Sequence, residues 1–513
     1  MDRIIQRLGR IPLGGVAIAL IVALTLWRPN MNRLGYEHAL PTVAVVVAIA
    51  AATTVALRYM LGGWARAGIA ASLLAAVTFY SVPIARAVGG SHYLAAIVLA
   101  IVVAALLLAR RIPGGEAAIA LNGKLNILLT AFAVFLSTSI AFQQIRLEMA
   151  RPDIDPQFAE LEGNAAPNSP DVWHILFDRY ASNEVLAQRY GFDNRPFLAE
   201  LEKRGFTVGS GNFSNYQRTA HSVATTLNGA SLDRLARSVD GSSNDWVPIY
   251  RAIAANEATK FFDRNDYRTV FAGTWWSPTR KLNTHELISY RALPELGRLI
   301  LDQSIIGAAL RWGALPYGDG RREQCERENA KFRELKKLAG SNGRNYVFAH
   351  FLVPHPPFVL NADGSCRTLN QARAASRRDN YVAQVEYVNR QMIRLVDSIL
   401  AGPGDEVIVV HSDEGPWPEP YVGNEHGIGT DPVSVDWRHV DSPRLREKMG
   451  ILMAVRGPAG PPATMPSSPV QIYPAILRDH FGSRQPLPEN KHEVFESDSE
   501  LYRFHDIASK LGS

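Results

Sequence analysis

The sequence predicts an α/β protein with a membrane part in front: an N-terminal bundle of five transmembrane helices, then a domain with a mostly parallel sheet between helices. Two observations support this fold class. Five long apolar runs lie within residues 1–145, and after residue 170 short apolar runs alternate with helical patterns. With 513 residues, the chain is also too long for one ordinary domain.

Each apolar run of the first part approaches the ~20 residues that cross a ~30 Å hydrocarbon core. None carries an internal charge, and five such runs in succession fit buried helices of a soluble domain poorly. A signal peptide is a poor reading of the first run, because the Trp27-Arg28-Pro29 that ends it is not a small-residue cleavage site. The runs cover residues 11–27, 39–57, 68–85, 93–109 and 125–142.

The placement of Lys and Arg around these runs predicts the orientation of the chain. Eight basic residues lie before the first run or in the second and fourth loops, against three in the first and third loops. The N-terminus is therefore expected in the cytoplasm, and the part after residue 145 on the periplasmic or extracellular side of the cell (inner) membrane. An even number of spans would reverse this, and the third run, which contains Pro83, is the weakest.

The formal net charge of +5 is unevenly distributed, with +8 in residues 1–145 and −3 in the remainder. The basic balance therefore belongs to the flanks of membrane segments. The sequence contains no long Lys/Arg run with interleaved aromatic residues, which excludes nucleic acid as a predicted partner. Cys325 and Cys366 are the two cysteines, both in the external part, where a disulfide is possible; the sequence leaves their pairing open.

We divide the external part into a polar, Pro-rich linker (146–170), an α/β domain (171–485) and a C-terminal tail (486–513) to which the sequence assigns no role. Apolar, β-branched runs that alternate with helices predict parallel strands covered on both faces. In such sheets, ligands bind beyond the carboxyl ends of the strands. The predicted strands are 172–177, 268–273, 346–353, 406–410 and 450–455.

Several residues with chemical potential follow these strands. Asp178 ends the first, His355 lies in a Pro-His-Pro-Pro turn after the third, and Asp413 and Glu414 follow the fourth. Thr219 begins a segment that reads as a helix, where unpaired N–H groups favour an anion. Each alone has a structural explanation, as a cap, a rigid turn or a solvated corner. The case for function is that all are expected at one edge of one sheet.

A cluster of Asp178, Asp413 and Glu414 cannot stay ionised without a cation. A divalent metal ion would satisfy it and would activate a neighbouring hydroxyl, which makes Thr219 a candidate nucleophile. His355 and His426 are candidates for holding the oxygens of a phosphate or sulfate, or for protonating a leaving group. Arg218, beside Thr219, could add positive charge, although surface solvation is the simpler explanation.

Four segments together resemble the sulfatase-like hydrolases and transferases of the alkaline phosphatase superfamily: 172-VWHILFDRYAS-182, 212-NFSNYQRTAHSVATTLNG-229, 346-YVFAHFLVPHPPFVLNADG-364 and 408-IVVHSDEGP-416. The resemblance covers most of residues 171–485. Five spans followed by such a domain look like lipoteichoic acid synthases and phosphoethanolamine transferases, which move a phospho-alcohol head group through a covalent phosphothreonine.

The resemblance implies an alkaline-phosphatase-like catalytic domain and a role for each matched residue. Asp178 and Asp413 match metal-binding acids, and Thr219 matches the nucleophile, which also touches the metal. His355 and His426 match histidines that contact the substrate head group or a second metal. The implied partners are a membrane phospholipid as donor and a glycan or lipid as acceptor.

One position departs from the family pattern. Where the family has Asp-His-Gly, this chain has Asp413-Glu414-Gly415. Glu414 can replace an imidazole as an oxygen ligand, and such a site should favour Mn²⁺, Mg²⁺ or Ca²⁺ over Zn²⁺. The alternative is a decayed site. Around Thr219 there is also no Cys/Ser-x-Pro-x-Arg run, which argues against sulfate ester hydrolysis through formylglycine.

The leading hypothesis is therefore a membrane-anchored, metal-dependent phosphotransferase with a Thr219 covalent intermediate. One alternative is a phosphoester or sulfuric ester hydrolase of the same family, with water as the final acceptor. The other is a non-catalytic membrane protein whose external domain binds a glycan or a partner.

Overall fold

The structure is a computed structural model, which describes residues 2–87, 101, 104, 115–311, 320–341, 343–423 and 435–512. The chain forms two compact units. Unit 1 contains Met1–Ala150 together with Leu293–Asp319, and unit 2 contains Arg151–Ala292 together with Gly320–Ser513. The chain thus passes between the units three times.

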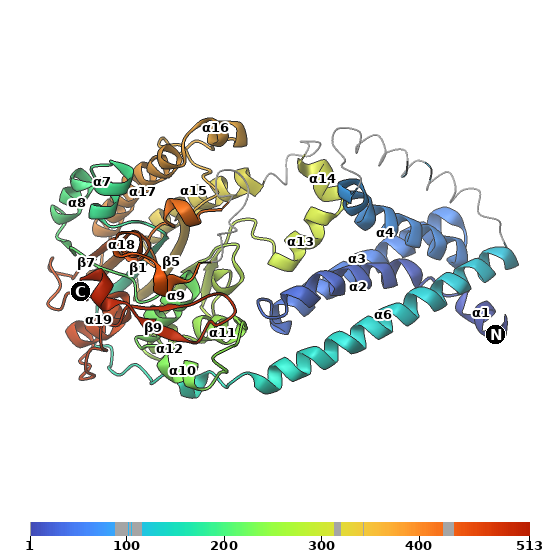
Figure 1. Ribbon diagram of the computed structural model, residues 1–513, viewed down its shortest axis with the longest axis horizontal. Coiled ribbons are helices and arrows are strands. Elements are labelled where there is room, and N and C mark those ends of the chain that lie inside the picture. Colours follow the sequence, from blue (N-terminus) through green and yellow to red (C-terminus); the bar gives the residue numbers. More distant parts are fainter. Residues whose placement is uncertain are drawn as a thin grey trace. The chain divides into compact units, whose positions relative to one another are not determined.

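Unit 1 is a set of apolar helices (Figure 1). Within the described residues, three are long and apolar enough to cross a membrane: α3 (Tyr36–Leu61), α4 (Trp64–Ala87) and α6 (Glu116–Ala150), the last continuing toward Gln157. They correspond to the second, third and fifth predicted spans. The first predicted span is the shorter apolar helix α2 (Gly14–Trp27), preceded by α1 (Asp2–Leu8). The fourth run, 93–109, lies almost entirely outside the described residues.

A segment from the middle of the chain also belongs to unit 1. Helices α13 (Glu295–Gln303) and α14 (Ile305–Arg311) pack on α2 and α4. Leu296 and Ile300, four residues apart on one helical face, are 1% and 5% exposed and join the apolar cluster around Trp27. The predicted domain of residues 171–485 is continuous in sequence, whereas the structure assigns Leu293–Asp319 of that range to unit 1.

Unit 2 is built on a seven-stranded sheet in the order β2-β7-β6-β1-β5-β3-β4. The central strands β6, β1, β5, β3 and β4 are parallel, and β7 is antiparallel to both of its neighbours, β6 and β2. A hairpin of β8 and β9 forms a second small sheet. The strands are β1 Asp171–Asp178, β2 Thr207–Val208, β3 Arg268–Ala272, β4 Glu286–Ile288, β5 Asn345–Pro354, β6 Glu406–Ser412, β7 Met453–Arg456, β8 Glu493–Phe495 and β9 Phe504–Asp506.

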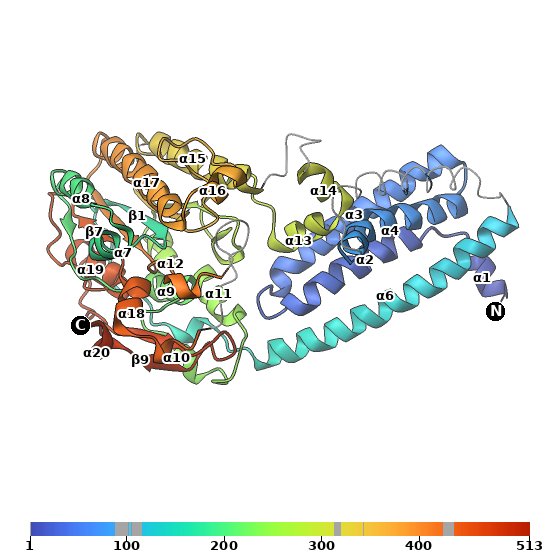
Figure 2. The ribbon, with the colours of Figure 1, turned by 45° about the horizontal axis from the view of Figure 1, so that its top comes forward.

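Helices cover both faces of this sheet (Figures 1 and 2). The helices of unit 2 are α7 Asn183–Tyr190, α8 Arg195–Glu202, α9 Thr219–Asn228, α10 Asp233–Arg237, α11 Val247–Ala254, α12 Glu257–Arg264, α15 Gly320–Leu338, α16 Leu369–Ala374, α17 Arg377–Leu400, α18 Ser442–Met449, α19 Ile472–His480 and α20 Ala508–Leu511.

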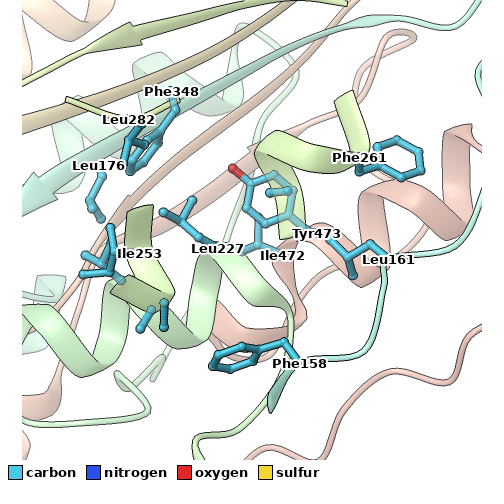
Figure 3. Close-up of a cluster of buried hydrophobic side chains, with 14 of the residues drawn as sticks. Phe158, Leu161, Leu176, Leu227, Ile253, Phe261, Leu282, Phe348, Ile472 and Tyr473 are labelled. Carbon is cyan, nitrogen blue, oxygen red and sulfur yellow. The ribbon is translucent and has the colours of Figure 1, made fainter. Parts of the chain in front are cut away.

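Two apolar cores lie on opposite faces of the sheet, and β1 contributes to both. Leu176 joins the core under α9, α11, α12 and α19, whereas Ile175 and Phe177 join the core under α7, α8, α15 and α17. This alternation follows from the two-residue period of a strand. It explains why most positions of β1, rather than every second one, are apolar, with the buried His174 as the polar residue inside the strand. Figure 3 shows Leu176 and Phe348 of the sheet with Leu227 and Ile253 of the covering helices.

The two cysteines form a disulfide, Cys325–Cys366. The bond links α15 to the loop after β5, across 41 residues of sequence. Disulfides persist in oxidising compartments, so the bond agrees with an external location for unit 2.

We expect Leu296→Ala to lower the free energy of unfolding by about 2–5 kcal/mol, because it opens a cavity against the apolar helices. Leu299→Ala, on the same helix but at a side chain that is 37% exposed, is the matched control and should cost far less. Thermal unfolding of the full chain in detergent measures both. Equal effects would show that α13 does not depend on this contact.

Candidate active site

The carboxyl ends of β1 and β6 bring two of the predicted acids together. The parallel register pairs Phe177 with Ser412, so the next residues, Asp178 and Asp413, both leave the sheet at the same edge. Asp178 is 3% exposed and Asp413 is fully buried. The sequence pattern predicted this convergence, and the structure shows it.

Thr219 is the first residue of α9, as the sequence predicted, and is half-buried. The C-terminal tail holds this helix start. Gln217 donates to the carbonyl of Phe495 at 2.8 Å, and the His221 ring contacts the carbonyl of Leu501 at 2.9 Å. The tail, to which the sequence assigned no role, therefore positions the candidate nucleophile.

Burial and mutual repulsion perturb both acids strongly. Burial, followed by the charge of Asp413, raises the pKa of Asp178 well above its usual range. Burial, followed by the charge of Glu414, raises the pKa of Asp413 to about 7. Hydrogen bonding from the Thr219 hydroxyl acts in the opposite direction on the pKa of Asp413. Within the described residues, Asp413 Oδ2 has no hydrogen-bond partner of standard length and angle.

The chain itself supplies positive charge beside the third acid. Glu414 Oε1 lies 2.6 Å from Lys448 Nζ and 3.2 Å from Arg179 Nε. All three side chains are buried, with at most 6% exposure. Burial is the main reason that the pKa of Lys448 falls to about 8, and the charge of Glu414 opposes that fall. The Asp413-Glu414 pair is thus not a solvated corner, because Glu414 forms buried ion pairs with Lys448 and Arg179.

Two backbone features make this ion pair possible. Arg179 has a positive φ of 63°, which is uncommon for a residue with a side chain. Its N–H donates to Asp413 Oδ1 at 3.1 Å, and its carbonyl accepts from the Tyr381 hydroxyl at 2.6 Å. Gly415 lies so close to the end of α18 that a Cβ there would come within 2.3 Å of the carbonyl of Glu447. A side chain at residue 415 would therefore push α18 and its Lys448 away from Glu414.

Three cationic side chains contact the buried ring of Trp417. The guanidinium of Arg218 and the ammonium of Lys448 each lie 4.8 Å from the ring centroid, and Arg179 lies 5.6 Å from it. Arg218 also pairs with Asp498 of the tail at 2.7 Å, so it is not simply a solvated surface residue. An aromatic face attracts cations and helps to hold them together despite their repulsion.

Of the two predicted histidines, His355 lies within the described residues. The backbone N–H of His355 donates to the carbonyl of Asp178 at 3.1 Å, so His355 lies at the same edge as the acids. Burial, more than the charge of Arg179, lowers the pKa of the His355 ring well below its usual range, which keeps it neutral at pH 7. His426 lies outside the described residues.

The residues at this edge fit an oxygen-preferring cation. Asp178 Oδ1, Asp413 Oδ2 and Glu414 Oε2 are buried without a standard hydrogen-bond partner among the described residues. Because uncompensated buried oxygens are costly, they indicate a ligand. No group of three or more His, Cys, Asp or Glu side chains forms a metal site within the described chain. Asp178, Asp413 and the Thr219 hydroxyl are the groups at this edge that could hold a cation, whereas one oxygen of Glu414 is engaged by Lys448 and Arg179.

The sequence did not predict the roles of Arg179, Lys448 and the tail, nor the contacts of the Trp417 ring with the cations. The signal for a positive partner was the Asp-Glu pair itself, which needs one. The spacing of the sequence could not identify Lys448, because it lies 34 residues after Glu414 and meets it only when α18 packs against the loop. Arg179 follows Asp178 directly, but its unusual backbone conformation is not visible in the sequence.

We expect Lys448→Met to lower the free energy of unfolding by about 3–5 kcal/mol, because it removes one partner of a buried ion pair. The double variant Lys448→Met/Glu414→Gln should recover much of this loss. Lys203→Met, which breaks an exposed pair with Glu200, is the control and should change little. Denaturant unfolding measures all three, and a double variant no better than Lys448→Met would contradict the pairing.

No family model matches the sequence, and no curated protein matches it. Similar solved structures include the C-terminal periplasmic domain of EcEptC from Escherichia coli, with a TM-score of 0.45, 10% identity and coverage of 69% of this chain and 96% of that one. The soluble domain of lipooligosaccharide phosphoethanolamine transferase A from Neisseria meningitidis has a TM-score of 0.33 and 13% identity, with coverage of 58% and 81%. A protein in the alkaline phosphatase superfamily from Vibrio parahaemolyticus has a TM-score of 0.37 and 10% identity, with coverage of 67% and 77%. The similar structures also include BT1596, described as a 2-O GAG sulfatase, with a TM-score of 0.37, 14% identity and coverage of 64% and 78%.

Proposed function

We propose that the protein is a membrane-anchored, metal-dependent phosphotransferase that moves a phospho-alcohol head group from a phospholipid to a glycan or lipid acceptor. The observation that carries this proposal is the placement of the Thr219 hydroxyl beside the buried carboxyl group of Asp413, which lies at the same edge of the sheet as Asp178 and, like it, has an unpaired oxygen within the described chain. A nucleophile and a cation site at the carboxyl edge of a parallel sheet are what phosphoryl transfer requires.

Asp178, Asp413 and the Thr219 hydroxyl would hold a divalent cation, and the remaining oxygen of Glu414 faces the same cluster. When bound, the cation would lower the pKa of the threonine hydroxyl and offset negative charge at the phosphorus. Carboxylate and hydroxyl ligands favour Mn²⁺, Mg²⁺ or Ca²⁺ over Zn²⁺.

The chain's own cations supply the rest of the positive charge. Arg218 directly precedes the candidate nucleophile, and Lys448 and Arg179 lie over the same Trp417 ring as Arg218 does. The three are arranged before substrate arrives, so they need not reorganise as charge develops on the phosphoryl oxygens. In this proposal Glu414 fixes Lys448 and Arg179 in place. The Glu that replaces the family's His in the Asp-His-Gly pattern therefore has a function and is not a sign of a decayed site.

The transfer takes place in two balanced steps. Thr219 Oγ forms a bond to phosphorus while the bond from phosphorus to the diacylglycerol oxygen breaks; the hydroxyl proton leaves and the diacylglycerol oxygen takes up a proton. An acceptor hydroxyl then forms its own bond to phosphorus while the bond from phosphorus to Thr219 Oγ breaks; the acceptor oxygen loses its proton and Thr219 Oγ takes up a proton. His355 is proposed as a group that contacts the head group.

The membrane anchor suits a lipid donor. With the N-terminus inside and an odd number of spans, unit 2 faces the outside, as the disulfide also favours. A nucleophile tethered at a bilayer meets lipid head groups at high effective concentration.

The carboxylates without an ion-pair partner predict the number of metal ions. Glu414 is already engaged by Lys448 and Arg179, which leaves two carboxylates, Asp178 and Asp413, as ligands for about one divalent ion per chain. Elemental analysis of the full chain in detergent should find about one equivalent, and a chelator should lower the unfolding temperature. Asp178→Asn and Asp413→Asn should lose the ion, whereas Asp171→Asn, at the opposite end of β1, should keep it. Two equivalents would refute this ligand count, and none would refute metal dependence.

Isosteric substitution of two threonines of α9 tests the nucleophile. We expect Thr219→Val to abolish covalent labelling and turnover, since it removes the attacking oxygen. Thr225→Val is the matched control: Thr225 is buried in the same helix, and its hydroxyl lacks a hydrogen bond within the described chain. The measurement is peptide mass after incubation with vesicles of phosphatidylethanolamine or phosphatidylglycerol.

The same experiment separates the alternatives. A label that is released to water at the same rate with and without a glycan acceptor would identify a hydrolase. A wild-type chain that is never labelled, binds no metal and is unaffected by chelator would be a non-catalytic binding protein.

A further inference from the structure

A cavity with a volume of about 430 Å³ lies next to the candidate active site. Four arginines line it: Arg189 at the end of α7, Arg377 and Arg378 at the start of α17, and Arg444 on α18. Two acids, Glu419 and Glu447, are also in its wall. The volume is within the range of small-molecule sites in proteins.

Arg377 is built into this cavity rather than carried on its surface. Its side chain is 6% exposed. Its Nη2 donates to the carbonyl of Trp417 at 2.8 Å, and its Nη1 lies 3.3 Å from Glu419 Oε2. The Tyr190 hydroxyl is 3.4 Å from Nη1, and the Tyr190 ring packs on Tyr381 at a centroid distance of 4.4 Å. These contacts fix the guanidinium of Arg377 in one position in the cavity wall.

The charges of the wall leave an excess of positive charge. Glu419 is 69% exposed, so its charge is largely screened by water. Burial raises the pKa of Glu447 to about 7, which reduces its negative charge near neutral pH. Arg444 pairs with Asp441, and Arg189 lies 3.5 Å from Glu447, but no ion pair within the described residues involves Arg378. Arg378 also stands in the first turn of a 24-residue helix, whose N-terminal end favours an anion.

Trp417 connects the cavity to the active site. Its carbonyl is held by Arg377 in the cavity, while its ring faces Arg218 and Lys448. Glu447, in the cavity wall, directly precedes Lys448, which pairs with Glu414. A ligand in the cavity would therefore lie against the same residues that shape the active site.

We propose that this cavity binds a phosphate-bearing small molecule or saccharide end, held by the forked guanidinium groups. Arginine is suited to phosphate because its planar fork can donate two parallel hydrogen bonds. The binding itself does not depend on the proposed function. Only its role does: in a phosphotransferase, a phosphorylated ligand beside the nucleophile would be the acceptor's anionic end.

The test measures binding to the full chain in detergent, in the presence of a chelator and at constant ionic strength. The probes are inorganic phosphate, pyrophosphate and glucose 1-phosphate, and isothermal titration calorimetry measures the binding of each. The cavity variant is Arg378→Gln/Arg444→Gln, which spares the buried Arg377 and its contacts. The control variant is Arg373→Gln/Arg390→Gln, which removes the same charge from exposed positions of α16 and α17 outside the cavity wall.

We expect the cavity variant to weaken binding of at least one probe by about tenfold or more, since charge-assisted hydrogen bonds are lost. The control variant should bind as the wild type does. Preference for glucose 1-phosphate over inorganic phosphate would identify a saccharide-borne phosphate as the ligand, and the reverse would identify the free ion.

Three results would overturn the inference: no binding of any probe, equal weakening in both variants, or no weakening in the cavity variant. Its failure is distinct from that of the proposed function. Loss of probe binding confined to the cavity variant, in a chain whose Thr219 never carries a covalent group, would keep the phosphate site and remove its acceptor role.

Discussion

Three carboxyl groups buried at one edge of a sheet are the constraint around which this site is built. Ionised acids in such a place repel one another and lose their hydration, so each needs a compensating charge or a proton. Glu414 is compensated by Lys448 and Arg179, at 2.6 and 3.2 Å. Asp178 and Asp413 have no comparable partner in the described chain, and their pKa values rise accordingly. The asymmetry separates one structural acid from two that can serve a cation.

The compensation involves segments far apart in sequence. The loop after β6 supplies Glu414, α18 supplies Lys448, and the turn after β1 supplies Arg179. The C-terminal tail holds the start of α9 and pairs with Arg218. Trp417 packs against all three cations. A change in any of these segments would therefore reach the nucleophile through packing and charge rather than through direct contact.

Much of this arrangement was accessible from the sequence, for a physical reason. Strands buried on both faces are apolar throughout, so β1, β5 and β6 stand out, and the polar residues that follow them mark the edge of the sheet. Thr219 was accessible as a helix start beside a polar stretch. Lys448 was not, because a lysine near a helix end has many ordinary explanations and only tertiary packing brings it to Glu414. The packing of α13 in unit 1 could not be predicted either, because 295-ELGRLILDQ-303 has the pattern of an ordinary amphipathic helix.

The packing of α13 in unit 1 has a consequence for producing the protein in pieces. Leu296 and Ile300 are covered by helices that precede residue 150. A soluble fragment that begins at the linker would keep α13 but lose its cover, and the exposed leucine and isoleucine would favour aggregation. A workable truncation would have to remove two stretches of chain, the N-terminal helices and the segment from Leu293 to Asp319, and rejoin the backbone across the second gap.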